Sequence, residues 1–93
     1  MSRRLDDREA EREVAALPNL GPASARMLVA AGFRNRGDLE EAGAPFAFRA
    51  VQRRHDGRAS VNLLYALHGA LSGRHWLDLS EAERSQLRTE AGL

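Results

Sequence analysis

The sequence contains no cysteine and no lysine, so all fourteen of its basic residues are arginine. The lack of cysteine excludes a disulfide scaffold and a thiolate metal site. No apolar run approaches the roughly 20 residues of a membrane span. The first residues, "MSRRLDDREAEREV", also lack the apolar core of a signal peptide. We therefore expect a cytoplasmic protein that does not associate with membranes.

The composition of the 93 residues is that of one globular domain, with 43% hydrophobic and 29% charged residues. The formal net charge is only +1, but the charges are unevenly distributed. Residues 17–37 carry three arginines and no acid, and residues 42–58 carry four arginines and only Asp56. Two basic segments indicate an anionic partner, although a solvated mixture of charges fits the same composition.

The apolar residues recur at helical spacings and never alternate over a useful length, which predicts an all-α protein. We expect a single compact bundle of five or six short helices over residues 1–93. It divides into a charged N-terminal helix within 1–16, a core bundle over 17–79 and an exposed last helix over 80–93. The expected helices are 5–16, 22–31, 36–42, 45–55, 61–72 and one that begins after Ser80.

The helix "SVNLLYALHGALSG", residues 60–73, is the most hydrophobic and is expected at the centre of the bundle. Gly69 in its middle costs roughly 1 kcal/mol against alanine, which predicts that another helix packs closely there. His68 lies on the apolar arc and is interpreted as a hydrogen-bonded core residue. No metal-ligand pattern is present, and no metal or cofactor is expected.

The stretch "LPNLGPASARMLVAAGF", residues 17–33, begins a helix at Gly21-Pro22 without a side-chain cap. Glycine offers no acceptor, so the amides near Ala23 and Ser24 can face a phosphate oxygen. Arg26 lies one turn further on. Asn19 tolerates the left-handed backbone that such a turn needs.

This turn resembles the second half of a helix–hairpin–helix, a motif that holds a nucleic-acid backbone without reading its sequence. Asn19 stands where that motif has its first glycine, and Ala23 stands where it has a basic residue. The alternative is that Gly-Pro only makes a sharp corner between two helices.

Three segments, "LPNLGPASARMLVAAGF", "GDLEEAGA" and "SVNLLYALHGALSGRHWLDLS", together resemble the C-terminal domain of the TfoX family of competence regulators. The resemblance runs from about Leu17 to Glu83. It implies a helical bundle with a helix–hairpin–helix-like corner in a bacterial cytoplasmic protein, and a role in regulating competence or transcription. The family's other domain, an α/β unit, does not match any part of this sequence.

The segment "GRHW" is a possible partner patch, in which Arg74 and His75 lie beside Trp76. The alternative is that Trp76 only closes the core. No nucleophile or nucleotide-binding motif is present, so neither an enzyme nor a small-molecule substrate is expected.

The leading hypothesis is a non-enzymatic regulatory module that binds a nucleic-acid backbone. Its expected contact residues are Asn19, Gly21, Ala23, Ser24, Arg26, Arg53 and Arg54. The alternative is a protein-interaction adaptor that docks onto a transcription factor or another chain, which the acidic "DDREAERE" favours.

Overall fold

The computed structural model describes residues 6–93, which form six α-helices and one short 3₁₀ turn without any strand. The all-α prediction is confirmed. The first expected helix was predicted from residue 5, which lies outside the described residues. The elements are α1 (Asp7–Ala15), α2 (Pro22–Ala30), α3 (Arg36–Ala42), α4 (Ala44–Arg54), α5 (Val61–Ser72), η1 (Trp76–Asp78) and α6 (Glu81–Glu90).

Local capping chemistry explains where most of these helices begin. The Asn35 side chain accepts a hydrogen bond from Asp38 N at the start of α3, and Ser60 accepts one from Asn62 N at the start of α5. Ser80 and Glu83 form the reciprocal capping box that "SEAE" predicts at the start of α6. The η1 turn was not predicted, since three residues carry no periodic signal.

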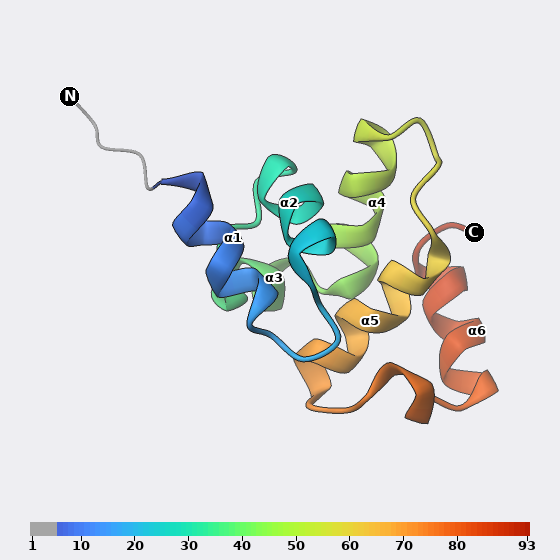
Figure 1. The fold of residues 1–93 in the computed structure, drawn as a ribbon. Helices are drawn as coiled ribbons and strands as arrows, with labels where there is room; N and C mark the ends of the chain where they lie inside the picture. The colour runs from blue at the N-terminus through green and yellow to red at the C-terminus, as the bar shows by residue number, and fades with distance from the viewer. Residues whose placement is uncertain (1–5) are drawn as a thin grey trace.

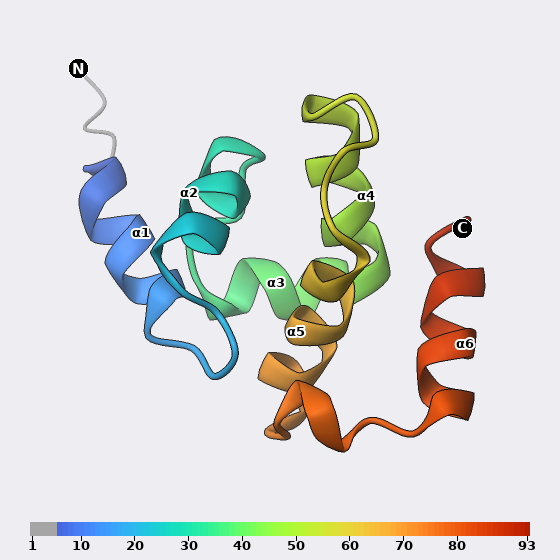
Figure 2. The same cartoon turned by 45° about the vertical axis from the view of Figure 1, so that its right-hand side comes forward.

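Helix α5 lies at the centre of the molecule, as its composition predicts, and seven of its twelve residues are buried. It packs against α4 and α3 on one side and against η1 and α6 on another. Helices α1 and α2 pack against each other at one end of the molecule, and α6 lies at the opposite end (Figures 1 and 2). Apolar residues from all six α-helices form one continuous core.

The groups closest to Gly69 do not come from a packed α-helix, so the expectation that another helix packs closely at this residue was wrong. A Cβ atom at this position would lie against Asn19 Nδ2 and 2.6 Å from the backbone oxygen of Arg74. The small residue leaves room for the hairpin between α1 and α2 and for the segment after α5. A periodic pattern cannot reveal this arrangement because loops make the approach.

His68 also differs from its prediction as a hydrogen-bonded core residue. It is only half-buried and lines a groove between α5 and α6. Within residues 6–93 its imidazole ring makes no hydrogen bond, and only its backbone oxygen accepts one, from Ser72 Oγ.

Candidate functional site

The start of α2 lies at the end of the hairpin that joins it to α1. Gly21 is the N-cap residue, with an extended backbone (φ −122°) and no side-chain hydrogen bond to the helix. The first intrahelical bond runs from Ala25 N to Gly21 O at 2.9 Å. The amides of Ala23 and Ser24 lie before the first donor of the helix and so have no partner within it. The first turn also contains no acidic residue. This helix end therefore keeps its partial positive charge free of any side-chain cap.

Helix α4 also begins without a side-chain cap, after Gly43. Its first residue, Ala44, is buried in the core, and α4 follows α3 directly. At the start of α2, by contrast, Pro22 and Ala23 are both exposed. Among the helices of residues 6–93, only α2 combines a missing side-chain cap with exposure of its first two residues.

Asn19 fixes the shape of the hairpin. It has the left-handed backbone that the sequence predicts, with φ 69°. Its side-chain amide donates to Arg74 O at 2.8 Å, and its oxygen accepts from Trp76 N at 3.3 Å. The side chain is thus directed into the molecule, where it fastens the hairpin to the segment between α5 and η1. Asn19 can therefore contribute to a ligand site only indirectly, because its side chain positions the backbone of the hairpin before α2.

A groove between α2 and the end of α4 brings the two basic segments together. It is lined by Ala23, Arg26, Met27 and Ala30 from α2, and by Arg54 and His55 from the end of α4, and its volume is about 400 Å³. Arg26 and Arg54 are exposed, and within residues 6–93 neither side chain forms a hydrogen bond or ion pair. Two arginines 28 positions apart in the sequence therefore share one surface with the start of α2.

Arg53 lies on a different surface from Arg54. It lines a second groove with Arg49, and the C-terminal Ala91 and Leu93 lie opposite them. In the described part of the chain the side chains of Arg49 and Arg53 also have no partner. The sequence could not separate Arg53 from Arg54, because neighbouring residues on a helix project about 100° apart and the covering elements were unknown.

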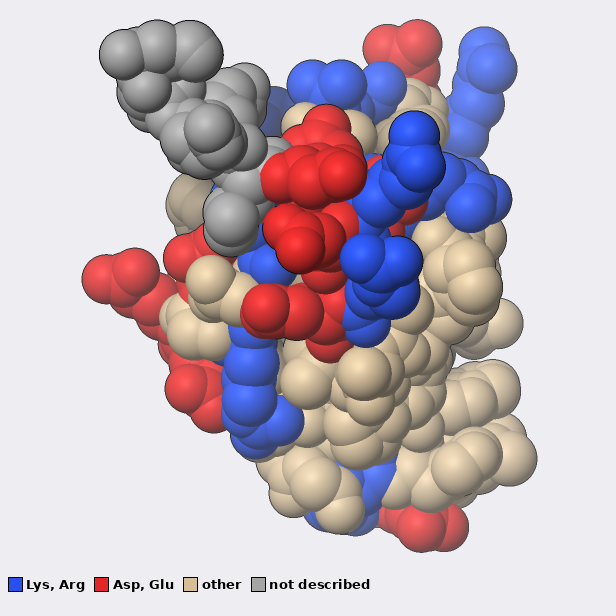
Figure 3. All heavy atoms as spheres, turned by 60° about the vertical axis from the view of Figure 1, so that its left-hand side comes forward, with Lys and Arg blue, Asp and Glu red and all other residues tan. Residues whose placement is uncertain are grey.

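Four of the other arginines form ion pairs, namely Arg34, Arg36, Arg74 and Arg88. Arg36 pairs with Glu40 at 2.6 Å, and Arg88 pairs with Glu81 at 3.0 Å. Figure 3 shows arginine side chains gathered in the upper part of one face, with acidic side chains directly beside them. The cations around α2 and the end of α4 are therefore among those available for an external anion, as are Arg8 and Arg12 on α1, whose side chains are also unpaired within residues 6–93.

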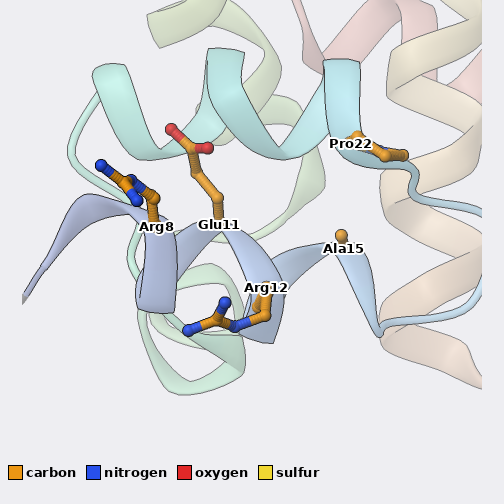
Figure 4. Close-up of a pocket in the computed structure, with 5 residues that line it drawn as sticks. All are labelled: Arg8, Glu11, Arg12, Ala15 and Pro22. Atoms are coloured by element: carbon orange, nitrogen blue, oxygen red, sulfur yellow. The ribbon is translucent and has the colours of Figure 1, made fainter.

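The other side of α2 faces α1 and carries charges of both signs. A groove of about 260 Å³ there is lined by Arg8, Glu11, Arg12, Ala15 and Pro22. In Figure 4 the Glu11 side chain points from α1 toward α2. Asp7, Glu9 and Glu13 on α1 are exposed. The groove on the α4 side therefore offers an anionic ligand two arginines and no carboxylate, whereas the groove on the α1 side places Glu11 beside its two arginines.

Arg74 and His75, two of the residues in the possible partner patch, make internal contacts. Arg74 donates to both carboxylate oxygens of Glu83 and to Asp78 O. The hydrogen bond from Arg74 lowers the pKa of Glu83 to about 2. His75 Nδ1 accepts from Leu77 N and so caps η1. These contacts hold η1 and α6 in place.

Trp76 is half-buried and packs against the core. Its ring lies 5.6 Å from the guanidinium carbon of Arg84, which also lies 5.1 Å from the ring centre of Tyr65. Trp76 thus contributes to closing the core, while the neighbouring His75 is exposed.

The described residues contain no group of three or more His, Cys, Asp or Glu side chains that could hold a metal ion. None of their helices is long and apolar enough to cross a membrane.

Sequence reasoning missed three residues of the groove between α2 and α4, namely Met27, Ala30 and His55. Met27 is only half-buried. The spacing Ala23, Met27 and Ala30 is itself a helical stripe, which was a usable signal. Nothing in the sequence indicates that the end of α4 lies beside it.

Comparison with known proteins gives consistent matches. Residues 10–91 match the family described as TfoX C-terminal domain. The chain is 31% identical over 87 residues to a DNA transformation protein TfoX1 of Aliivibrio fischeri, a match that covers 94% of this chain. It spans only 42% of the length of that relative.

Two crystal structures of proteins from Listeria monocytogenes, one titled an uncharacterized protein and the other a protein of unknown function, share the fold. The first has a TM-score of 0.74 and 32% identity, and the match covers 81% of this chain and 84% of the other. The second has a TM-score of 0.75 and 31% identity, with 84% and 95% covered.

Proposed function

The chain belongs to the TfoX family, whose C-terminal domain it matches, and from this premise we propose that it is a non-enzymatic regulatory module that binds a nucleic-acid backbone. The name of the Aliivibrio fischeri relative refers to DNA transformation. From this name we propose that the present chain has a role in the regulation of competence or transcription, within the cytoplasm.

The observation that carries the proposal is the groove between α2 and α4. Arg26 and Arg54 are exposed and unpaired there, and Ala23 from the uncapped first turn of α2 lines the same surface. Unpaired guanidinium groups and the free backbone amides at the start of a helix donate hydrogen bonds that phosphate oxygens accept. Arg49 and Arg53 carry further unpaired positive charge, on a different surface of α4.

None of these contacts reads a base edge in a groove of the duplex, so we expect little sequence selectivity. With about two to four phosphate contacts, the slope of log K against log salt is expected at about −2 to −4.

Substitutions of Gly21 test whether the α2 start takes part. A Cβ atom at Gly21 meets nothing within 4 Å, so both aspartate and alanine fit there. Gly21→Asp places a carboxylate over the free amides and repels a phosphate, and we expect at least a tenfold loss of affinity. Gly21→Ala leaves the amides free and is expected to bind within about twofold of the natural protein.

Fluorescence anisotropy with labelled oligonucleotides at low salt measures both affinities, and circular dichroism confirms that each variant is folded. Equal affinities of the folded aspartate and alanine variants would refute a phosphate at this helix start.

A specific observation also favours the adaptor function. Asp7, Glu9 and Glu13 on α1 are exposed and would suit a basic protein surface rather than a nucleic acid. If no oligonucleotide binds even at low salt, the adaptor becomes the better hypothesis.

A further inference from the structure

The surface between α2 and α4 is apolar as well as basic, and phosphate binding alone does not require this. Ala23, Met27 and Ala30 follow one another at helical spacing along α2 and form a continuous apolar stripe. Ala23 and Ala30 are exposed and Met27 is half-buried, so nothing in the described part of the chain covers the stripe. A ligand that fills this groove gains from an apolar face next to its negative charge.

Arg26 and Arg54 are placed to hold such a ligand from two sides. Arg26 projects from α2, whereas Arg54 and the neighbouring His55 come from the end of α4. Guanidinium and imidazole groups are planar, and in RNA-binding proteins they stack on unpaired bases. The groove volume of about 400 Å³ lies within the roughly 300–1,000 Å³ range of small-molecule sites.

We propose that this groove binds one unpaired nucleotide of a single-stranded nucleic acid, with its base against Met27 and its phosphate between Arg26 and Arg54. In a duplex the faces of the bases are stacked and inaccessible, so only a single strand can use the apolar stripe. The inference rests on the proposed function and adds the class of nucleic acid that the site prefers.

Three labelled probes of equal length separate base binding from phosphate binding. They are a 12-nucleotide thymidine strand, the same backbone with abasic residues, and a 12-base-pair duplex. The thymidine strand is expected to bind about tenfold more tightly than the abasic strand, which carries the same phosphates but no base to pack on the groove. It is also expected to bind more tightly than the duplex.

The variant Met27→Gln keeps the side-chain length but makes the groove polar. We expect it to weaken binding of the thymidine strand about fivefold and to leave binding of the abasic strand and the duplex unchanged. Leu77→Gln is the matched control, since Leu77 is 62% exposed on η1, outside the groove. It should change none of the affinities. Thermal melting by circular dichroism verifies that both variants are folded.

The outcomes distinguish this inference from the proposed function. Equal binding of the thymidine and abasic strands, or tighter binding of the duplex, overturns the inference and leaves backbone binding in place. Failure of every probe to bind at low salt overturns both. Loss of thymidine-strand affinity to the same extent in Leu77→Gln and Met27→Gln also overturns the inference.

Discussion

At the scale of single residues, Asn19 and Gly69 act as a matched pair. The Asn19 amide reaches across to Arg74 O and Trp76 N, and Gly69 supplies the space that this side chain occupies. The hairpin before α2 is therefore fastened to the far end of α5. The sequence correctly indicated the left-handed backbone of Asn19, because that preference is local. It could not indicate the partners, which lie 55 and 57 positions away.

Gly69→Ala is expected to destabilise the protein although alanine favours helices. The added Cβ collides with Asn19 Nδ2 and the Arg74 backbone, and such overpacking costs roughly 1–3 kcal/mol. The gain in helix propensity is only about 1 kcal/mol. We expect a net loss of up to about 2 kcal/mol in the free energy of unfolding, measured by urea denaturation.

The control for this prediction is Gly21→Ala, where the added Cβ has open space. It should change the free energy of unfolding by less than about 0.5 kcal/mol. Equal stability of Gly69→Ala and the natural protein would mean that the Asn19 contact is easily rearranged.

At the scale of elements, arginine contacts help to hold α6 in place. Arg74, in the segment after α5, pairs with Glu83, and Arg88 donates to the Tyr65 hydroxyl at 2.6 Å. Leu87 is the buried apolar residue of α6 itself.

The Glu83 contact predicts how stability depends on pH. Because the hydrogen bond from Arg74 lowers the folded pKa of Glu83 from 4.5 to about 2, its contribution is fully present above pH 4.5. It is lost as the pH falls from 4.5 through 2. Glu83→Gln, which still suits a capping box, lacks this contribution at every pH.

We therefore expect the melting temperature of the natural protein to exceed that of Glu83→Gln at pH 6, and the difference to shrink by pH 2.5. Circular dichroism melts measure both. Glu13→Gln, at an exposed position on α1, is the control and should show no comparable change. A difference between the natural protein and Glu83→Gln that stays constant across this range would contradict the role given to the Arg74–Glu83 pair.

At the scale of the whole molecule, the packing of α2 against α4 brings two unpaired arginines, Arg26 and Arg54, into one groove. The groove on the α1 side of α2 combines Glu11 with Arg8 and Arg12. The sequence predicted the helices well because caps and apolar periodicity are local signals. It also located the two basic segments. It could not place Arg54 beside Arg26 and Arg53 elsewhere, since that depends on how α2 and α4 pack.

The most direct measurement of the central claim compares two double variants that lose the same charge from different surfaces. Arg26→Ala/Arg54→Ala removes the cations of the groove between α2 and α4. Arg8→Ala/Arg12→Ala removes two arginines from α1, whose side chains are also unpaired within residues 6–93.

Anisotropy titrations of both folded variants with a labelled oligonucleotide, from low to moderate salt, decide the matter. We expect Arg26→Ala/Arg54→Ala to lose most of its affinity and to reduce the salt slope by about 2. The α1 variant should bind much as the natural protein does. Equal losses in the two variants would mean that only overall charge matters, and would contradict a binding site in this groove.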